Sequence, residues 1–412
     1  MNDHQHVEPI PEAVGDDYIP RNAQHWRREH YIPICKTELV DLLSDELAAP
    51  DQADFRDLCR KIDLTVQFEL HRELDSLKQA YEKVNPDPDT LPLREITHED
   101  REASFELLFD RFESALLRAN FHRLSREQIE DAVGASSHWG VPLDIDFDVF
   151  DRLVVFARGD VIGKRVLHSA RNFFRPKLVE VPTYQRVAAI YRLREHDRLA
   201  EGDDTRIVYL KFLKNVPKED VDMMLPGGRV KMSLLDGGKI ILPTVSGVAI
   251  ATIKVLKGAL LLAFAGIYGF IAFIGLVAGT IGYGVKSFFG YRRIMDTYEL
   301  NRTRSLYFQN LDNNAGVLFR VIDESHDQEF RETVLAYYML WKNAPAAGWS
   351  EQELDEATER KLRGITGLDI DFQVDDAVAK LNRYGLATQD AAQRWHAVPI
   401  ETARENTNWS TK

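Results

Sequence analysis

The chain has 412 residues and a formal net charge of −13, and hydrophobic residues make up 44% and aromatic residues 10% of it. This composition excludes an intrinsically disordered chain, and the length predicts two or three domains. The two cysteines, Cys35 and Cys59, form no CxxC pattern. They exclude a disulfide-built scaffold and indicate a reducing compartment.

Residues 1–24 are acidic and contain several prolines. A secretory signal would need a basic start followed by an apolar stretch, and a mitochondrial transit peptide would be poor in acids. We therefore expect a flexible acidic tail that is not a targeting segment.

Residues 25–146 are predicted to form a helical domain. From Phe55 to Val84 the apolar residues recur every three or four positions, which indicates one long amphipathic helix. The stretch Asn85-Pro86-Asp87-Pro88 ends it, and a second apolar face runs from Phe105 to Leu116.

Residues 147–239 are predicted to form a basic α+β module. Residues 151–240 hold 18 basic and 12 acidic side chains, whereas residues 1–150 hold 16 basic and 33 acidic ones. Short β-type runs separated by turn-forming residues predict a small antiparallel sheet. Between two of these runs we expect a helix at Val161–Phe174.

The most basic part of this module is residues 161–179, which carry five cations and no acid. One interpretation is that they contact anionic lipid headgroups, each cation contributing about 1 kcal/mol near such a surface. The other is that they pair with acidic side chains of the N-terminal helical domain. The predicted headgroup residues are Lys164, Arg165, Arg171, Arg175 and Lys177.

Residues 240–290 are predicted to form a transmembrane region. Gly258–Val285 is a run of 28 residues without a charged side chain, and about 20 apolar helical residues cross a bilayer. The weaker apolar segment 240–256 favours a helical hairpin with both ends in the cytoplasm, while a single span stays open. Gly275 and Gly279 form a GxxxG step, which indicates either packing against a partner helix or a second copy, or only the high frequency of glycine in membrane helices.

Residues 291–412 are predicted to form a helical, winged-helix-like domain. Helical patterns near 317–322 and 328–341 are followed by a capping box at Ser350. A further helix is predicted over 374–384, with Gly385 as its C-terminal cap. A short β-wing is expected after it, and the fold class is therefore a membrane-anchored α+β protein.

No catalytic, cofactor or metal site is predicted, because the histidines are scattered and no nucleophile motif is present. The stretch Gly279–Ser287 has the wrong spacing and context for a phosphate loop. The most unusual polar cluster lies after the apolar region. One interpretation is a helix cap or turn, and the other is a ligand site. This cluster contains Asp312, Asn313, Asn314 and Gly316.

Several blocks of the sequence resemble a family of uncharacterised membrane proteins that includes transmembrane protein 143. The blocks are residues 28–33 (REHYIP), 156–160 (FARGD), 211–217 (KFLKNVP), 307–318 (YFQNLDNNAGVL) and 336–338 (AYY). The resemblance implies a multi-pass membrane protein and provides no catalytic residues. Together with the acidic N-terminus it implies a bacterial inner-membrane protein whose domains face the cytoplasm.

The leading functional hypothesis is a non-enzymatic scaffold or adaptor at the inner membrane, with an unknown protein partner and no cofactor. The alternative is an enzyme or lipid-handling protein with a site assembled across domains. A nucleic-acid binder is less favoured, because the third helix of the winged-helix-like domain has no net charge. A homo-oligomer stays open.

Overall fold

The computed structural model describes residues 27–134, 143–144, 146–168, 176–197, 204–226, 229–230, 282, 289, 292 and 307–407. The chain divides into two compact units. The first comprises residues 1–125, 148–218 and 310–412, and the second comprises residues 126–147 and 219–309. In the second unit, α4 (Arg126–Gly134) accompanies a short antiparallel pair, β2 (Leu143–Asp144) with β6 (Arg229–Val230).

Three helices of the first unit come from the N-terminal part of the chain: α1 (Lys36–Asp45), α2 (Ala49–Glu82) and α3 (His98–Arg118). The apolar stripe of α2 is buried along its whole length, as the three-and-four spacing predicts. A capping box between Thr97 and Asp100 starts α3, because each side chain satisfies a backbone N–H of the other residue. The two predicted N-terminal helices are confirmed.

The sheet of the first unit has five antiparallel strands in the order β1-β3-β4-β5-β7. Its long central strands are β3 (Phe150–His168), β4 (Pro176–Leu193) and β5 (Val208–Pro217), flanked by β1 (His122–Arg123) and β7 (Asn310–Asn313). A 3-10 turn, η2 (Phe147–Val149), leads into β3, and η4 (Lys218–Met224) follows β5. The predicted antiparallel sheet is confirmed.

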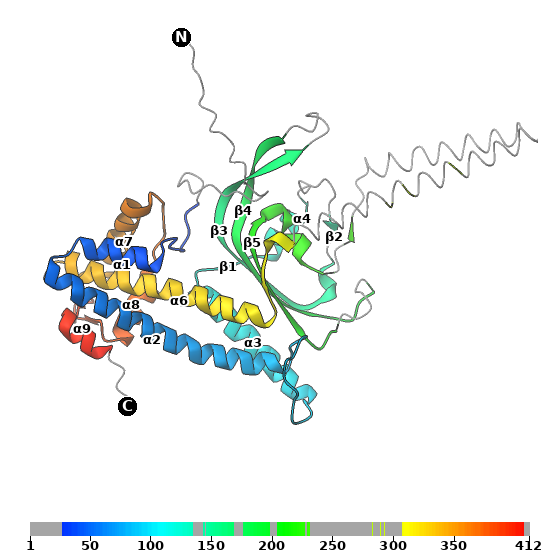
Figure 1. Cartoon of the computed structure of the whole chain (residues 1–412), viewed down its shortest axis with the longest axis horizontal. Coiled ribbons are helices and arrows are strands. Elements are labelled where there is room, and N and C mark those ends of the chain that lie inside the picture. The colour runs from blue at the N-terminus through cyan, green and yellow to red at the C-terminus, as the bar shows by residue number, and fades with distance from the viewer. Residues whose placement is uncertain are drawn as a thin grey trace, which may run out of the picture. The chain divides into compact units, whose positions relative to one another are not determined.

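The C-terminal part returns to the N-terminal helices. The helix α6 (Ala315–Tyr338) lies beside α2 and α3, and it continues into a π-helical turn, Met339–Asn343 (Figure 1). After it come α7 (Glu351–Thr366), α8 (Val374–Arg383), the hairpin β8 (Ala387–Gln389) and β9 (Trp395–Ala397), and α9 (Ile400–Asn406). Three helices followed by a hairpin is the predicted order of elements.

Two of the local signals in this part act as predicted. The Ser350 hydroxyl accepts the backbone N–H of Glu353, which completes the capping box of α7. Gly385 follows α8 with a φ of +66°, a conformation that glycine adopts at no steric cost. The two helical patterns near 317–322 and 328–341 belong to one helix, so the prediction of separate helices is wrong.

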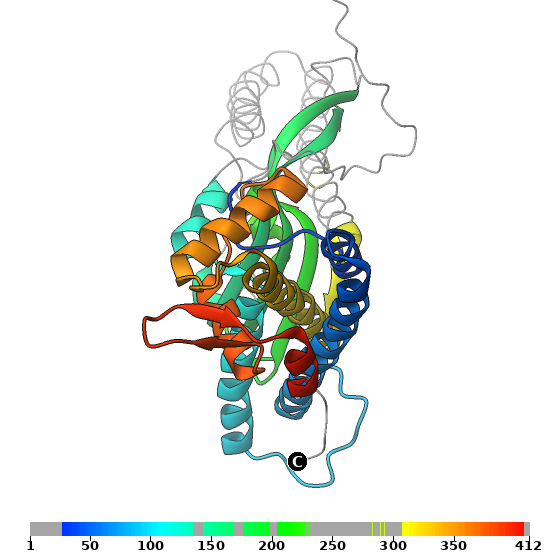
Figure 2. The ribbon, with the colours of Figure 1, turned by 90° about the vertical axis from the view of Figure 1, so that its left-hand side faces the viewer.

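One hydrophobic core joins these elements. It includes Leu58 of α2, Phe109 of α3, Phe212 of β5, Tyr337 of α6 and Leu381 of α8, all almost completely buried. The N-terminal helices, the sheet and the C-terminal helices therefore stabilise one another (Figure 2).

The structure contradicts the membrane-anchored fold class. No helix among the residues it describes is both long enough and apolar enough to cross a bilayer. Helix α2, with 34 residues, is long enough to cross a bilayer. Only one of its faces is packed, however, and charged residues lie along the others. The predicted transmembrane region 240–290, with its packing residues Gly275 and Gly279, lies outside the described residues except at 282 and 289.

The helix predicted at Val161–Phe174 is also wrong. Residues 161–168 continue β3 and pair with residues 176–183 of β4 in an unbroken antiparallel register. The outer ends of β3 and β4 extend beyond β5, which pairs with β4 only from Thr183 onward (Figure 2). We call residues 161–182 the outer arm. Residues 169–175 lie outside the described part of the chain.

Candidate functional site

An N-terminal strap, residues 27–34, connects the sheet to the helices. Its backbone bonds to the sheet through the Arg27 N–H, which donates to the Asp160 carbonyl at 3.1 Å. On the other side the Asp371 N–H donates to the Glu29 carbonyl at 2.9 Å. Further along, the Ile32 N–H donates to the Gln328 side chain of α6. The strap therefore has a fixed course between three distant segments.

The Glu29 carboxylate fixes the strap on β3. Its two oxygens accept the backbone N–H groups of Gly159 and Asp160, both at 2.6 Å. Gly159 has a φ of +78°, and a Cβ there would lie 2.7 Å from the Cβ of Gln185. Only glycine fits this position, because both the backbone conformation and the space exclude a side chain.

Next to this turn, Arg158 is a buried cation with only 2% of its surface exposed. Its guanidinium donates to Glu324 of α6 at 2.5 Å and to the Ala119 carbonyl at 2.9 Å. It also lies 3.9 Å from the ring centroid of Tyr31 and 4.5 Å from that of Phe121. One arginine thus holds the sheet, α6, the end of α3 and the strap together.

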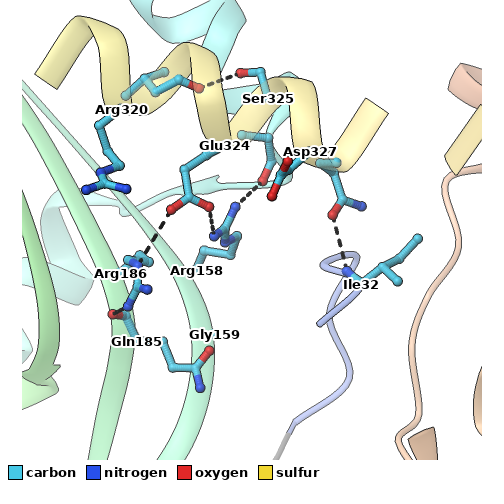
Figure 3. Close-up of polar contacts among 12 residues, drawn as sticks. Ile32, Arg158, Gly159, Gln185, Arg186, Arg320, Glu324, Ser325 and Asp327 are labelled. Atoms are coloured by element: carbon cyan, nitrogen blue, oxygen red, sulfur yellow. Dashed lines mark hydrogen bonds and ion pairs between the residues drawn. The ribbon is translucent and has the colours of Figure 1, made fainter. Parts of the chain in front are cut away.

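Glu324 lies between two arginines of the sheet, as Figure 3 shows. Its second oxygen is 3.7 Å from Nε of Arg186. Burial raises the pKa of Glu324, but Arg158 and then Arg186 outweigh it, so the pKa is lowered and the carboxylate stays ionised.

The strap forms one wall of a cleft of about 850 Å³. We call it the acidic cleft, because six carboxylates and three guanidiniums line it. The other walls are the outer face of α3, β1, the turn at Asp160, and the start of α8 with the residues before it. The carboxylates belong to Glu29, Asp110, Glu113, Asp160, Asp371 and Asp376, and the guanidiniums to Arg27, Arg28 and Arg118.

These carboxylates differ in how far the protein already neutralises them. Asp160 pairs with Lys218 at 2.6 Å, and Asp371 with Arg28 at 3.1 Å. Within the described residues Asp110 is exposed and makes no hydrogen bond or ion pair. Glu113 on the same wall pairs with Arg123 at 3.2 Å, so the negative charge that the α3 wall leaves unpaired is that of Asp110.

Under the cleft lies a chain of buried polar side chains. Asn120 donates to the His30 carbonyl of the strap and to Glu332 of α6, both at 2.8 Å. The other oxygen of Glu332 accepts from Nζ of Lys380 on α8 at 2.9 Å. Gln328 donates to the same carboxylate at 2.9 Å. These hydrogen bonds connect the strap, α6 and α8 beneath the cleft, although Oδ1 of Asn120 is buried without a partner among the described residues.

The titratable groups of the cleft do not form a catalytic pair. Burial, with Lys218 and His30, lowers the pKa of His122 against the opposing effect of Glu29 and Asp160, so the imidazole is neutral at pH 7. Ser114 also lines the cleft. Within the described part of the chain its hydroxyl makes no hydrogen bond, and so neither His30 nor His122 accepts its proton. A nucleophile and its base would lie within hydrogen-bonding distance.

Metal binding receives no support here either. Across the described residues no group of three or more His, Cys, Asp or Glu side chains has an arrangement that could hold a metal ion. Cys59 is buried in the core, which raises the pKa of its thiol and keeps it protonated.

Asp355 of α7 interacts electrostatically with Asp371 and Arg28, which line the cleft, and it makes the stability of the fold depend on pH. Burial, followed by Glu359 and Asp371, raises the pKa of Asp355 from 3.8 to about 6 against the effect of Arg28. The folded state therefore binds this proton more tightly, so the contribution to stability falls as pH rises from about 4 to about 6. One carboxylate oxygen is buried without a hydrogen bond.

Replacing Asp355 by asparagine is therefore expected to stabilise the protein above pH 6 and to have little effect below pH 4. The gain at pH 8 is on the order of 1 kcal/mol after solvent screening is discounted. Thermal unfolding of both proteins at pH 4 and pH 8 measures it. An equal change at the two pH values would contradict the assigned titration.

Residues 150–316 are similar to a protein family described as a protein of unknown function, DUF3754. No solved structure matches the chain. The matched range contains β3, β4, β5 and β7, together with the turn that Glu29 binds. The resemblance to the family of transmembrane protein 143 stays a prediction, as does the location at the bacterial inner membrane.

The predicted headgroup residues fall in the outer arm. Arg171 and Arg175 lie outside the described residues, and for Lys164, Arg165 and Lys177 only the backbone, within β3 and β4, is described. Their role stays a prediction.

The polar cluster at 312–316 forms the junction between β7 and α6. Asp312 and Asn313 pair with Phe212 and Lys211 of β5, so two of the family-like blocks lie side by side. Asn314 has a φ of +50°, and its side chain makes no capping hydrogen bond. A Cβ on Gly316 would lie 3.1 Å from Oδ1 of Asp312. The structure therefore supports the interpretation as a turn.

The acidic cleft was not predicted, although two of its parts were visible as sequence blocks. Residues 28–33 and 156–160 meet where Glu29 binds the turn at Gly159. The two basic residues of α8 have acidic partners within the fold: Lys380 is buried against Glu332, and Arg383 pairs with Glu69 at 2.9 Å.

Proposed function

We propose that this chain is a non-enzymatic adaptor whose acidic cleft binds a basic segment of a partner protein. The observation that carries the proposal is the charge of a preformed cleft of about 850 Å³, in which six carboxylates face three guanidiniums. Complementary charge speeds association and selects the partner.

The shape of the cleft favours a peptide segment as its occupant. Asp110, Glu113 and Leu117 line it on α3, and at 1.5 Å per residue this wall is roughly 10 Å long. Leu117 is 51% exposed, so it offers an apolar surface to the aliphatic stem of a bound lysine or arginine. Because the strap and the buried floor are already fixed, little ordering cost remains for the protein.

The test is binding of a fluorescent peptide rich in lysine and arginine, measured by fluorescence anisotropy. Reversing two charges of the α3 wall, Asp110→Lys with Glu113→Lys, is expected to weaken binding at least about tenfold, or about 1.4 kcal/mol. Raising the salt concentration from 0.1 M to 1 M should weaken binding to the unaltered protein, since the Debye length falls from about 10 Å to about 3 Å.

The matched control reverses two exposed acids outside the cleft, Asp75→Lys with Asp89→Lys, which changes the net charge equally. This variant should bind the peptide within about twofold of the unaltered protein. Equal weakening by both variants would mean that the peptide responds only to overall charge, and the cleft would not be its site.

A further inference from the structure

The outer arm has the charge that the acidic cleft lacks. Residues 161–179 carry five cations and no acid, within a chain whose net charge is −13. Of the segments of this chain, the arm is therefore the one whose positive charge best matches the basic occupant proposed for the cleft.

The arm is also built to reach outward. Residues 161–168 and 176–182 pair with each other. In the described residues neither β1 nor β5 runs beside them, since β1 ends its pairing at Ala157 and β5 at Thr183. The outer backbone edges of this ribbon are therefore unpaired among the described residues, although the side chains of Val161 and Val181 at its base are buried.

The arm cannot enter the cleft of its own chain. It starts next to Asp160, which lines the cleft, and the eight residues to His168 extend about 25 Å at roughly 3.3 Å per residue. Folding back would require the continuous register between β3 and β4 to break. A second copy has no such restriction.

We infer that the outer arm of one copy inserts into the acidic cleft of a second copy, so that the protein associates with itself. This inference rests on the proposed function, because it names the basic segment that the cleft binds. Since the arm begins at the rim of the cleft, two copies related by a twofold axis exchange arms, and each completes the site of the other. Reciprocal exchange closes a dimer, the commonest closed assembly.

The experiment is sedimentation velocity of the full-length chain at 0.1 M salt, with a non-ionic detergent to prevent association through the uncharged run 258–285. The cleft variant is Asp110→Lys with Glu113→Lys, and the arm variant is Arg171→Glu with Arg175→Glu. The unaltered chain is expected to sediment as a dimer and each variant as a monomer. An equimolar mixture of the two variants, or one chain with all four changes, is expected to dimerise again.

Restored association of complementary charges separates the inference from a general loss of folding, because a misfolded variant would not be rescued by its partner. A monomeric unaltered chain that still binds the basic peptide would overturn the inference and leave the proposed function standing. If the unaltered chain neither bound the peptide nor associated, both the inference and the proposed function would be wrong. Association that survives reversal of the cleft, or an arm that binds anionic vesicles while the chain stays monomeric, would also overturn the inference.

Discussion

Replacing Arg158 by methionine is expected to lower the free energy of unfolding by about 3–5 kcal/mol. Methionine fills part of the space but leaves Glu324 with Arg186 at 3.7 Å and the weaker effect of Arg320, and the Ala119 carbonyl loses its donor. A buried carboxylate without a close counter-charge costs far more than the pair contributes when it is intact. Urea unfolding at pH 7 measures the loss.

The matched control is Arg360→Met. This arginine is 69% exposed and lies 3.8 Å from Glu356, and such surface pairs contribute about 0–1 kcal/mol. The control should therefore lose less than about 1 kcal/mol, and a similarly small loss for Arg158→Met would contradict the central role of Arg158.

The loss at Arg158 should also depend on pH. Because the pKa of Glu324 is lowered in the folded state, its contribution to stability is present above its unfolded pKa of about 4.5 and disappears as pH falls through the folded value. The difference between the unaltered protein and Arg158→Met should therefore shrink on acidification below about pH 4. The difference in unfolding free energy that remains at low pH measures the loss of the hydrogen bond to the Ala119 carbonyl and of the contacts with the aromatic rings.

Replacing Lys380 by methionine is expected to cost a similar amount, about 3–5 kcal/mol. Burial alone would lower the pKa of Lys380, but Glu332 and Glu329 outweigh it and raise the pKa, so the ammonium is charged and pairs with Glu332. Without it, Glu332 remains almost completely buried with its charge opposed only by neutral donors. Chemical unfolding at pH 7 measures the loss.

The double variant Lys380→Met with Glu332→Gln should recover most of that loss. Glutamine keeps an acceptor for Asn120 and removes the uncompensated charge. Arg383→Met on the same helix is the matched control, since Arg383 is 52% exposed and pairs at the surface with Glu69. If the double variant were no more stable than Lys380→Met, the loss would come from packing and not from charge.

The elements that the sequence predicts best are those whose signal is local. The stripe of α2, the capping box at Ser350 and the glycine after α8 each depend on residues within a few positions of one another. The outer arm was mistaken for a helix because residues 161–179 do not alternate cleanly between apolar and polar side chains, which is the pattern that indicates a strand.

The acidic cleft could not be predicted, because its parts lie far apart in the chain. The carboxylate of Glu29 binds Asp160, 131 positions away, and Arg28 pairs with Asp371, 343 positions away. Nothing in the spacing of residues along a sequence indicates such contacts. The blocks at 28–33 and 156–160 marked the participants, but only the fold places them together.

The prediction of a membrane-anchored fold class was wrong for a different reason. It used one uncharged run to classify the whole chain, whereas the described helices owe their length to amphipathic packing around one core. A long apolar stretch is evidence only about its own residues.

The strap has a consequence for the order in which the protein is made. Its first residues leave the ribosome long before Gln328, Glu359 and Asp371, to which they finally bond. Domains whose ends meet in this way close slowly, because long loops must be ordered before their contacts form. The cleft is therefore completed only when the last helices dock, so a nascent or truncated chain has no finished binding site to offer.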